Sequence, residues 1–456
     1  MFWTIFKRET MDHMMSLRFS AIVILSLLLM VVSVLVFSVN YEKAAKEYPR
    51  RVAGLVNAEG KVDLRAIPGR GGATVLRLPS PLAFCSGTGE RELPDQVVMA
   101  VHGLRAIRHT SDIGDILRGS ADIDWAFVIS VFLSFGAGLL TYKSISGERR
   151  DGTLTLTLSH PVPRVTVLFA KYFAALFSLS AALLLAGLLS LIVLRSAGTV
   201  QLGGDDWVKL SLFGLVSVMY LSIFTLIGLL CSVFARTPLT SAASFLFVWT
   251  ALVFVIPNLA GIAAGLIGKV KTPLEMREMA NAIPDQLSLT VGMDNDEVAS
   301  VKLRRELARE RLLREYLQSL VRQVELGQNV ARISPMSTFS SATEQIVGGG
   351  TFRLMQFVQN AVHFREGFFR AIIEADKQDP QSQHRYVPWW VGSNPFSHRV
   401  VDIGPANEFR DVLPSSSEGL IAALWDILLL TFYNLLAFAV AFWRFARQDV
   451  APTPGM

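Results

Sequence analysis

A long apolar run at residues 165–194 decides the fold, and it reads VTVLFAKYFAALFSLSAALLLAGLLSLIVL. A helix rises about 1.5 Å per residue, so about 20 apolar residues cross a hydrocarbon core of about 30 Å. The run is long enough to cross a membrane at a tilt or to extend past the hydrocarbon. It predicts a helical membrane protein.

Working outward from this run, the chain shows five more apolar runs of span length, at 19–39, 125–142, 208–234, 239–267 and 419–443. Six spans place both termini on the same side of the membrane. Basic residues gather before the first span, in the connection 143–164 and in the tail 444–456, whereas the third-to-fourth connection carries Asp205 and Asp206. Short cytoplasmic loops are rich in Lys and Arg. We therefore expect a multi-pass protein of the cell membrane with both termini in the cytoplasm.

The composition supports this class. Hydrophobic residues make up 51% of the chain and charged residues 18%, against about a quarter charged in soluble domains. These values exclude an ordinary soluble enzyme, a disordered chain and a secreted disulfide scaffold. A net charge of +5 over 456 residues is typical of basic loops in a membrane protein. We expect no nucleic-acid partner.

The six spans leave two large insertions on the outer face, at 40–124 and 268–418. The first is rich in Pro and Gly, including Gly69, Gly71 and Gly72, and it predicts loops with short strands at 73–78 and 96–101. The second predicts helices at 295–326 and 352–373, and we favour a helical hairpin packed through its apolar stripes. Residues 1–18 are amphipathic and predict a helix in the cytoplasmic interface. The alternative for residues 1–18 is a cytoplasmic continuation of the first span.

Motifs for chemistry on this chain are missing from the sequence. There is no phosphate loop, no His-Glu-x-x-His and no Gly-x-Ser-x-Gly. His102 and His109 lie seven residues apart, which is a weak metal signal. We expect no catalytic residue, no metal and no cofactor on this chain.

Two residues inside the predicted spans call for an explanation. Asp426 lies about two turns into the last span, and an intramembrane carboxylate is a functional candidate by default. We favour a position near the outer interface, where a basic neighbour or water caps the carboxylate. The alternative is a proton-coupled carrier that uses Asp426. Pro257 lies inside the fifth span and predicts a kink there.

The connection 143–164 is the most informative stretch for function. It resembles the second-to-third connection in permease subunits of ABC-2-type ABC transporters. The positions that carry the resemblance are Glu148, Gly152, Thr153, Leu154, Ser159, Pro161, Arg164 and, at the start of the next span, Lys171. The segments 80–82 and 333–335 resemble the branch with enlarged outer domains. That branch includes the permease of the copper-delivery system for nitrous oxide reductase and gliding-associated permeases.

This resemblance implies a non-catalytic permease. Residues 1–18 and the connection 143–164 would dock onto a separate cytoplasmic ATPase, which would bind ATP and magnesium. The permease would work with a second permease copy, identical or not, and an outer partner protein is a further candidate partner. Leu154 and Leu158 lie four residues apart, so in a helix they share one face and would fill a groove on the ATPase. Glu148 and Arg164 would bind at the rim of that groove.

Three alternatives stay open at this point. The connection 143–164 could be a plain loop that touches no partner. The protein could be a polytopic membrane enzyme with an outer active site, or the proton-coupled carrier already described. If it is a permease, it could export a solute, or it could act mechanically on an outer partner.

Overall fold

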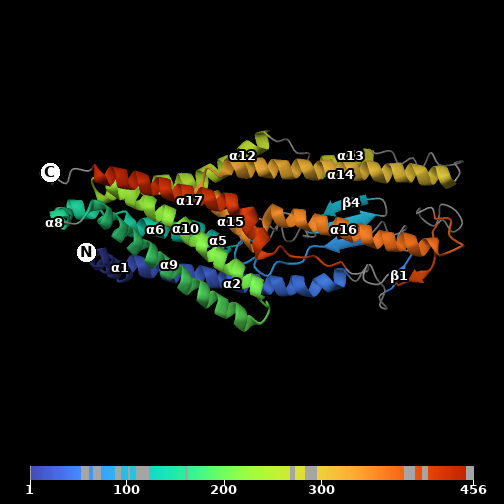
Figure 1. Ribbon diagram of the computed structural model, residues 1–456, viewed down its shortest axis with the longest axis horizontal. Helices are drawn as coiled ribbons and strands as arrows, with labels where there is room; N and C mark the ends of the chain where they lie inside the picture. The colour runs from blue at the N-terminus through green and yellow to red at the C-terminus, as the bar shows by residue number, and fades with distance from the viewer. Residues whose placement is uncertain are drawn as a thin grey trace.

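The computed structural model describes residues 2–52, 61–64, 73–87, 94–100, 103–108, 123–159, 163–267, 273–282, 295–384, 396–402 and 409–447. The molecule is elongated (Figure 1). A helical bundle at one end carries both termini, and the two insertions lie together at the other end. We call the end of the bundle that carries both termini the termini end and its opposite end the domain end. The part of the molecule that the two insertions form is the insertion domain.

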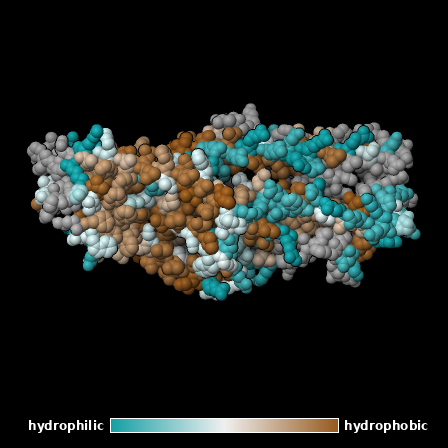
Figure 2. All heavy atoms as spheres, in the orientation of Figure 1, coloured by the Kyte–Doolittle hydropathy of each residue, from teal (hydrophilic) through white to brown (hydrophobic). Residues whose placement is uncertain are grey.

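Six helical stretches in the described residues are long and apolar enough to cross a membrane: Leu17–Lys46, Trp125–Arg150, Arg164–Ala197, Gly204–Phe234, Pro238–Ala263 and Ser416–Ala446. On the face shown in Figure 2, apolar side chains cover much of this half of the molecule, and hydrophilic side chains cover much of the insertion domain. The predicted α-helical polytopic membrane fold is confirmed.

The bundle is built from α1 (Phe2–Met14), α2 (Leu17–Val52), α9 (Arg164–Ala197), α10 (Gly204–Phe234), α17 (Ser416–Ala446) and two interrupted spans. The second span joins α5 (Trp125–Phe127), the π-helix η3 (Val128–Leu133) and α6 (Ser134–Thr141). The fifth joins α11 (Pro238–Thr250), the π-helix η4 (Ala251–Val255) and α12 (Ile256–Ile267). The short helices α7 (Ser146–Arg150) and α8 (Thr153–Ser159) lie between the second and third spans.

The first span is longer than expected. We expected an outer insertion from residue 40, but α2 continues as helix to Val52. This extension is rich in Ala, Glu and Lys, which favour helix, and Lys46 pairs with Glu42 one turn earlier at 2.5 Å. The helix therefore carries the chain out of the bundle and into the insertion domain.

Helix α10 forms the centre of the bundle. In the most apolar 18-residue stretch of α10, 72% of the residues are buried inside the protein. In the corresponding stretch of α17, 17% are buried. Close contact with the second span depends on glycine. A Cβ on Gly228 would lie 2.0 Å from the Thr141 hydroxyl, and a Cβ on Gly138 would lie 1.9 Å from the Phe245 ring. Small residues let membrane helices approach this closely.

Both interrupted spans contain a π-helical turn whose free carbonyls find partners. Pro257 lies two residues after the end of η4, and it has no backbone N–H to donate to the carbonyl one turn earlier. The expected kink at Pro257 thus takes the form of a π-helical turn. The Ser334 hydroxyl donates to the Leu252 carbonyl, and the Tyr220 hydroxyl donates to the Ser130 carbonyl at 2.9 Å.

The two insertions fold into one domain. The strands β2 (Ala73–Leu76), β3 (Gln96–Ala100) and β4 (Gly103–Arg108) form an antiparallel sheet, and β1 (Val62–Asp63) pairs with β5 (Val400–Val401) from the second insertion. The helices of the second insertion are α13 (Pro273–Ala282), α14 (Asn295–Ala331), α15 (Pro335–Val347) and α16 (Gly350–Lys377). The strand segments predicted at 73–78 and 96–101 lie at β2 and β3.

The expected self-contained helical hairpin is corrected by this sheet. Helix α14 packs on β4 and α16 packs on β3 (Figure 1). One apolar core joins Val75 and Val97 of the sheet to Leu313 of α14 and Phe357 of α16. The apolar stripes of the helices therefore cover the strands of the first insertion, because those strands bring apolar side chains that also need burial.

A buried ion pair fixes the two insertions to each other. The Arg353 guanidinium on α16 binds the Asp411 carboxylate, and both side chains are almost fully buried. The same carboxylate accepts a hydrogen bond from the Leu78 backbone N–H of the first insertion at 2.8 Å. A charge buried this deeply needs several partners, and they come from both insertions.

Helix α15 packs in the bundle and not in the insertion domain, although the whole of 268–418 was expected to form one insertion. It packs between α10 and α17, and its Phe339, Ala342 and Ile346 join the core of the bundle. The Phe339 ring stacks on Tyr220 with 4.5 Å between ring centroids. The second insertion therefore reaches back into the bundle, because one face of α15 is apolar enough to be buried there.

Candidate functional site

A buried lysine joins three elements at the termini end of the bundle. The Lys171 ammonium on α9 is 2.6 Å from the Glu9 carboxylate of α1 and 2.8 Å from the Glu148 carboxylate of α7. Only 2% of the Lys171 side chain is exposed. We call Lys171, Glu9 and Glu148 the lysine cluster. Glu148 was predicted to bind at the rim of a partner, but here it binds the start of the third span.

The N-terminal helix α1 also packs on α9 through aromatic side chains. The Phe2 ring lies edge-on to Phe173 at 6.5 Å, and the Phe6 ring lies edge-on to Phe177 at 6.0 Å. On the same helix, His13 is buried, and burial lowers its pKa despite the nearby Glu9 carboxylate. Helix α1 is thus a separate element fixed to the third span, as expected for an interfacial helix.

The connection 143–164 is fixed to the fourth span by main-chain hydrogen bonds. The Ser232 hydroxyl of α10 accepts from the Ile145 and Ser146 backbone N–H groups, each at 3.0 Å. The Arg149 guanidinium donates to the carbonyls of Val233 and Ala235 at the C-terminal end of α10. The connection is therefore a packed part of the protein.

Helix α8 begins after a left-handed turn at Gly152, whose φ of +75° strongly favours glycine. Leu154 was predicted to fill a groove on a partner, but it is 3% exposed and packs with Leu168, Val233 and Phe445. Leu154 faces inward because the third, fourth and sixth spans all lie close to it. Leu156 is 67% exposed on the same helix.

The other predicted docking residues differ in position. Thr153 and Ser159 are exposed on α8. The side chain of Leu158 and all of Pro161 lie outside the described residues, as do His102 and His109. Arg164 donates to the Phe445 and Ala446 carbonyls at 3.1 and 3.0 Å, so it caps the end of α17. Arg164 therefore joins the start of α9 to the end of α17, and its predicted contact with a partner stays a prediction.

Asp426 is fully buried near the domain end of the bundle, where α17 meets α14 and α15. Its carboxylate binds the Arg332 guanidinium at 2.6 Å and accepts from the Ser341 hydroxyl at 2.9 Å and the Gln345 amide at 3.1 Å. We call these four residues the aspartate cluster. The basic neighbour of the carboxylate is thus Arg332, which lies in the turn between α14 and α15.

A second set of polar contacts crosses the middle of the bundle. The Tyr172 hydroxyl on α9 is 2.6 Å from the Ser222 hydroxyl on α10, which donates to the Asn434 amide oxygen on α17. Asn434 in turn donates to the Met219 carbonyl at 3.0 Å. These hydrogen bonds therefore link α9, α10 and α17 at a level that lies between the lysine cluster and the aspartate cluster.

Sequence reasoning missed Glu9 and Arg332. A signal existed for each: a basic Lys171 at the start of an apolar span needs a carboxylate, and an intramembrane Asp426 needs a cation. Neither signal identifies the partner, because Glu9 is 162 residues from Lys171 and Arg332 is 94 residues from Asp426.

Chemistry of other kinds finds little support among the described residues. No group of three or more His, Cys, Asp or Glu in this part of the chain is placed to hold a metal ion. The insertion domain does contain a His384–Asp376 pair at 2.8 Å, but both serines in contact with Asp376 bind the carboxylate, not the imidazole. The arrangement fixes the turn after α16.

The comparison with protein families gives one match. A family model described as ABC-2 family transporter protein matches residues 3–450. No curated protein matches the chain. The matched range runs from α1 through all six spans and the insertion domain. The model covers nearly the whole chain, so the chain belongs to the ABC-2 family and is a membrane component of an ABC transporter.

Proposed function

We propose that this chain is the permease subunit of a two-component ABC transporter and that its termini end receives motion from a separate ATPase. The observation that carries the proposal is the lysine cluster. Lys171 binds one carboxylate from α1 and one from α7, which are the two elements that the family resemblance assigns to ATPase contact. A displacement of α1 or α7 would therefore move the third span directly.

The contacts around α8 support a mechanism in which α8 transmits a displacement to the spans. Ser232, Arg149 and Arg164 connect the 143–164 region to the ends of α10 and α17. Displacement of α8 would therefore move three spans together as packed bodies, which is how packed helices transmit motion. At the far end, α15 and the aspartate cluster link α10 and α17 to the insertion domain. The insertion domain would then act on a solute path between two permease copies or on an outer partner protein.

This function requires the termini end to face the cytoplasm and the insertion domain to lie outside. The abundance of Lys and Arg at the termini end supports that orientation. Both native cysteines are buried, so single added cysteines report cleanly. We expect Gln318→Cys on α14 to react with an impermeant maleimide added to intact cells, and Ser159→Cys on α8 to react only after lysis. The reverse pattern would invert the topology and exclude the proposed ATPase contact.

The test of the docking surface uses two leucines on one helix. Leu156→Asp changes an exposed side chain, so the permease should fold normally but lose co-purification with its ATPase at least tenfold. Leu154→Ala removes a buried side chain and should cost about 2 kcal/mol of the permease's own stability. Pull-down of the ATPase and thermal unfolding of the permease alone separate the two effects.

Equal ATPase recovery with wild type and Leu156→Asp would leave α8 as a plain connecting loop. Thr157→Asp serves as a control for the added charge, because Thr157 is only partly exposed and lies next in the chain. We expect it to have a smaller effect than Leu156→Asp if Leu156 is the anchor.

The carrier alternative is weakened by the aspartate cluster. A proton-carrying carboxylate must lose and regain its proton during transport, whereas Asp426 is held by a guanidinium, a hydroxyl and an amide. These partners lie in α15 and in the turn before it, so they fix the carboxylate to the second insertion. Asp426 is therefore assigned to the connection between the last span and the insertion domain.

A further inference from the structure

Arginine side chains from three elements gather where the fourth span ends. Arg149 lies on α7, Arg236 in the turn between α10 and α11, and Arg444 near the end of α17. The Arg149 guanidinium donates to the Val233 and Ala235 carbonyls, Arg236 follows Ala235 in the chain, and the Arg444 guanidinium lies over the Phe234 ring. We call these three residues the arginine cluster.

The donors of the cluster are only partly used within the described residues. Arg149 caps the end of α10, as described above. The Arg444 guanidinium lies 5.3 Å from the centroid of the Phe234 ring, and Arg236 is exposed. Among the described residues, neither Arg236 nor Arg444 forms an ion pair with a carboxylate. Two acids of the 143–164 connection bind other cations: Glu148 binds Lys171 and Asp151 binds Arg150.

Simple charge arithmetic shows a surplus at this place. The arginine cluster contributes three positive charges. The C-terminal ends of α10 and α17 offer about half a negative charge each, so about two positive charges remain after the helix ends are counted. Like charges held together favour a bound anion.

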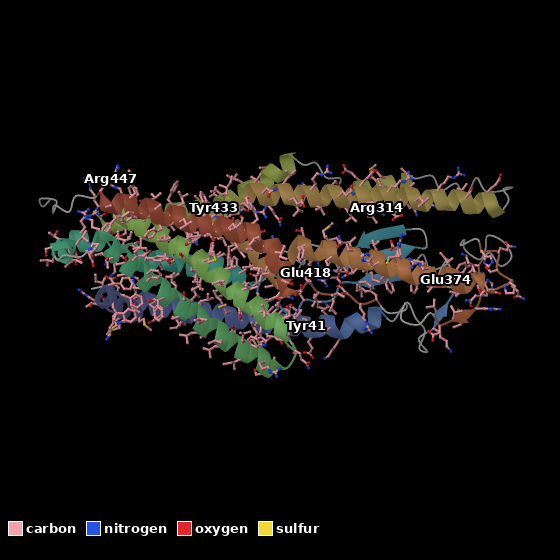
Figure 3. The ribbon with its side chains drawn as sticks, viewed as in Figure 1. Tyr41, Arg314, Glu374, Glu418, Tyr433 and Arg447 are labelled. Carbon is pink, nitrogen blue, oxygen red and sulfur yellow. The ribbon has the colours of Figure 1, made fainter. Side chains whose placement is uncertain are left out.

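The surroundings indicate what kind of anion fits. Arg236 follows α10 by two residues, where an apolar span meets the membrane surface. Exposed apolar side chains flank the cluster, with Phe234 49%, Trp443 53% and Leu239 80% exposed. Figure 3 shows Arg447, the next arginine along α17, at this same end of the bundle. A ligand with a phosphate group and acyl chains would satisfy both the guanidinium groups and the apolar rim.

We propose that the arginine cluster binds the phosphate group of an anionic phospholipid from the membrane leaflet at the termini end. Guanidinium groups bind phosphate in a bidentate manner, and Arg236 and Arg444 have the donors to do so. The bound lipid would hold the ends of α10, α11 and α17 together beside the 143–164 connection. The proposal needs a membrane at this end but not an ATPase, so it can fail while the proposed function stands.

The experiment compares lipid retention by the full chain in detergent. The protein is incubated with phosphatidylglycerol and phosphatidylcholine in equal amounts, and retained lipids are counted by native mass spectrometry. We expect wild type to prefer phosphatidylglycerol, and Arg236→Gln with Arg444→Gln to lower that preference about thirtyfold, since each basic residue near a membrane surface contributes about 1 kcal/mol. Arg8→Gln with Arg150→Gln is the matched control, because it removes two exposed charges that pair with Asp12 and Asp151.

Further arms separate the other anion sources. Arg236→Lys with Arg444→Lys keeps the charge and the fold but loses the bidentate geometry, so intermediate retention supports a phosphate site. An equal loss in the Arg8 and Arg150 control would overturn the proposal in favour of general surface charge. Displacement of the lipid by millimolar inorganic phosphate would overturn it in favour of a free anion. Unchanged lipid with lost ATPase binding would assign the cluster to an acidic surface of the ATPase.

Discussion

The lysine cluster and the aspartate cluster lie at opposite ends of the bundle, and each joins a span to an element outside it. In the lysine cluster one ammonium group binds two carboxylates, so the formal charges of the three groups sum to −1. The central charge of the aspartate cluster is a carboxylate that serves one guanidinium, so the pair sums to zero. The second oxygen of Glu148 also has no hydrogen-bond partner among the described residues.

This difference shows which contact depends on a single residue. Removal of the Lys171 charge leaves two like charges facing each other, on the partly buried side chains of Glu9 and Glu148, which are 16% and 27% exposed. Removal of the Asp426 charge leaves Arg332, whose side chain is 21% exposed and can turn toward water. The termini end should therefore be more sensitive to loss of its central charge than the domain end.

The largest effect is expected for Lys171→Met. The substitution keeps the length and apolar stem of the side chain but leaves Glu9 and Glu148 without their cation, which should cost about 3 kcal/mol. Helix α1 should then detach from α9, and limited proteolysis should cut near residues 15–16 much faster than in wild type. Lys171→Arg is the control, since it keeps the charge. Unchanged protection of α1 in Lys171→Met would show that the aromatic contacts alone hold the helix.

A smaller effect is expected for Asp426→Asn. The amide keeps one acceptor for Ser341 or Gln345 and loses the charge that binds Arg332, so the stability should fall by about 2 kcal/mol. Thermal unfolding in detergent measures the loss, and a double-mutant cycle with Arg332→Gln isolates the ion pair. Additive effects in that cycle would mean that Arg332 and Asp426 do not act together. Full stability with abolished transport would restore the proton-carrier interpretation.

The smallest effect is expected for Gly152→Ala, which tests the turn into α8 without touching either cluster. No atom lies within 4 Å of a Cβ at this position, so the cost is only that of a left-handed backbone, about 1 kcal/mol. Gly204→Ala is a control, because that Cβ also meets open space while the backbone is helical. Equal melting temperatures for the two variants would contradict a turn that requires glycine.

Local patterns in the sequence were reliable where one element decides its own structure. Apolar runs predicted six spans, and Pro257 predicted a disturbance in the fifth. Alternating apolar residues predicted the strand segments that became β2 and β3. The length of α2 beyond residue 40 and the burial of α15 were not predicted, because helix formers in an aqueous segment and a short apolar stripe each suit several environments.

The candidate site was identified only in part from the sequence. The resemblance pointed to the connection 143–164, but it assigned Leu154, Glu148 and Arg164 to a partner. In the structure Leu154 packs among spans, Glu148 binds Lys171 and Arg164 caps α17. Spacing along one helix shows which side chains share a face, but it does not show whether that face meets the protein's own spans or another protein.

The sequence by itself determined the class of protein, the number of spans and the family, because hydrophobicity, length and a local motif are properties of contiguous residues. Only the tertiary structure decided which charges meet. Lys171 with Glu9 and Asp426 with Arg332 join segments far apart in the chain, and the two insertions share one core. Such contacts depend on how separate helices pack, since a buried charge is stable only beside a partner that the fold brings to it.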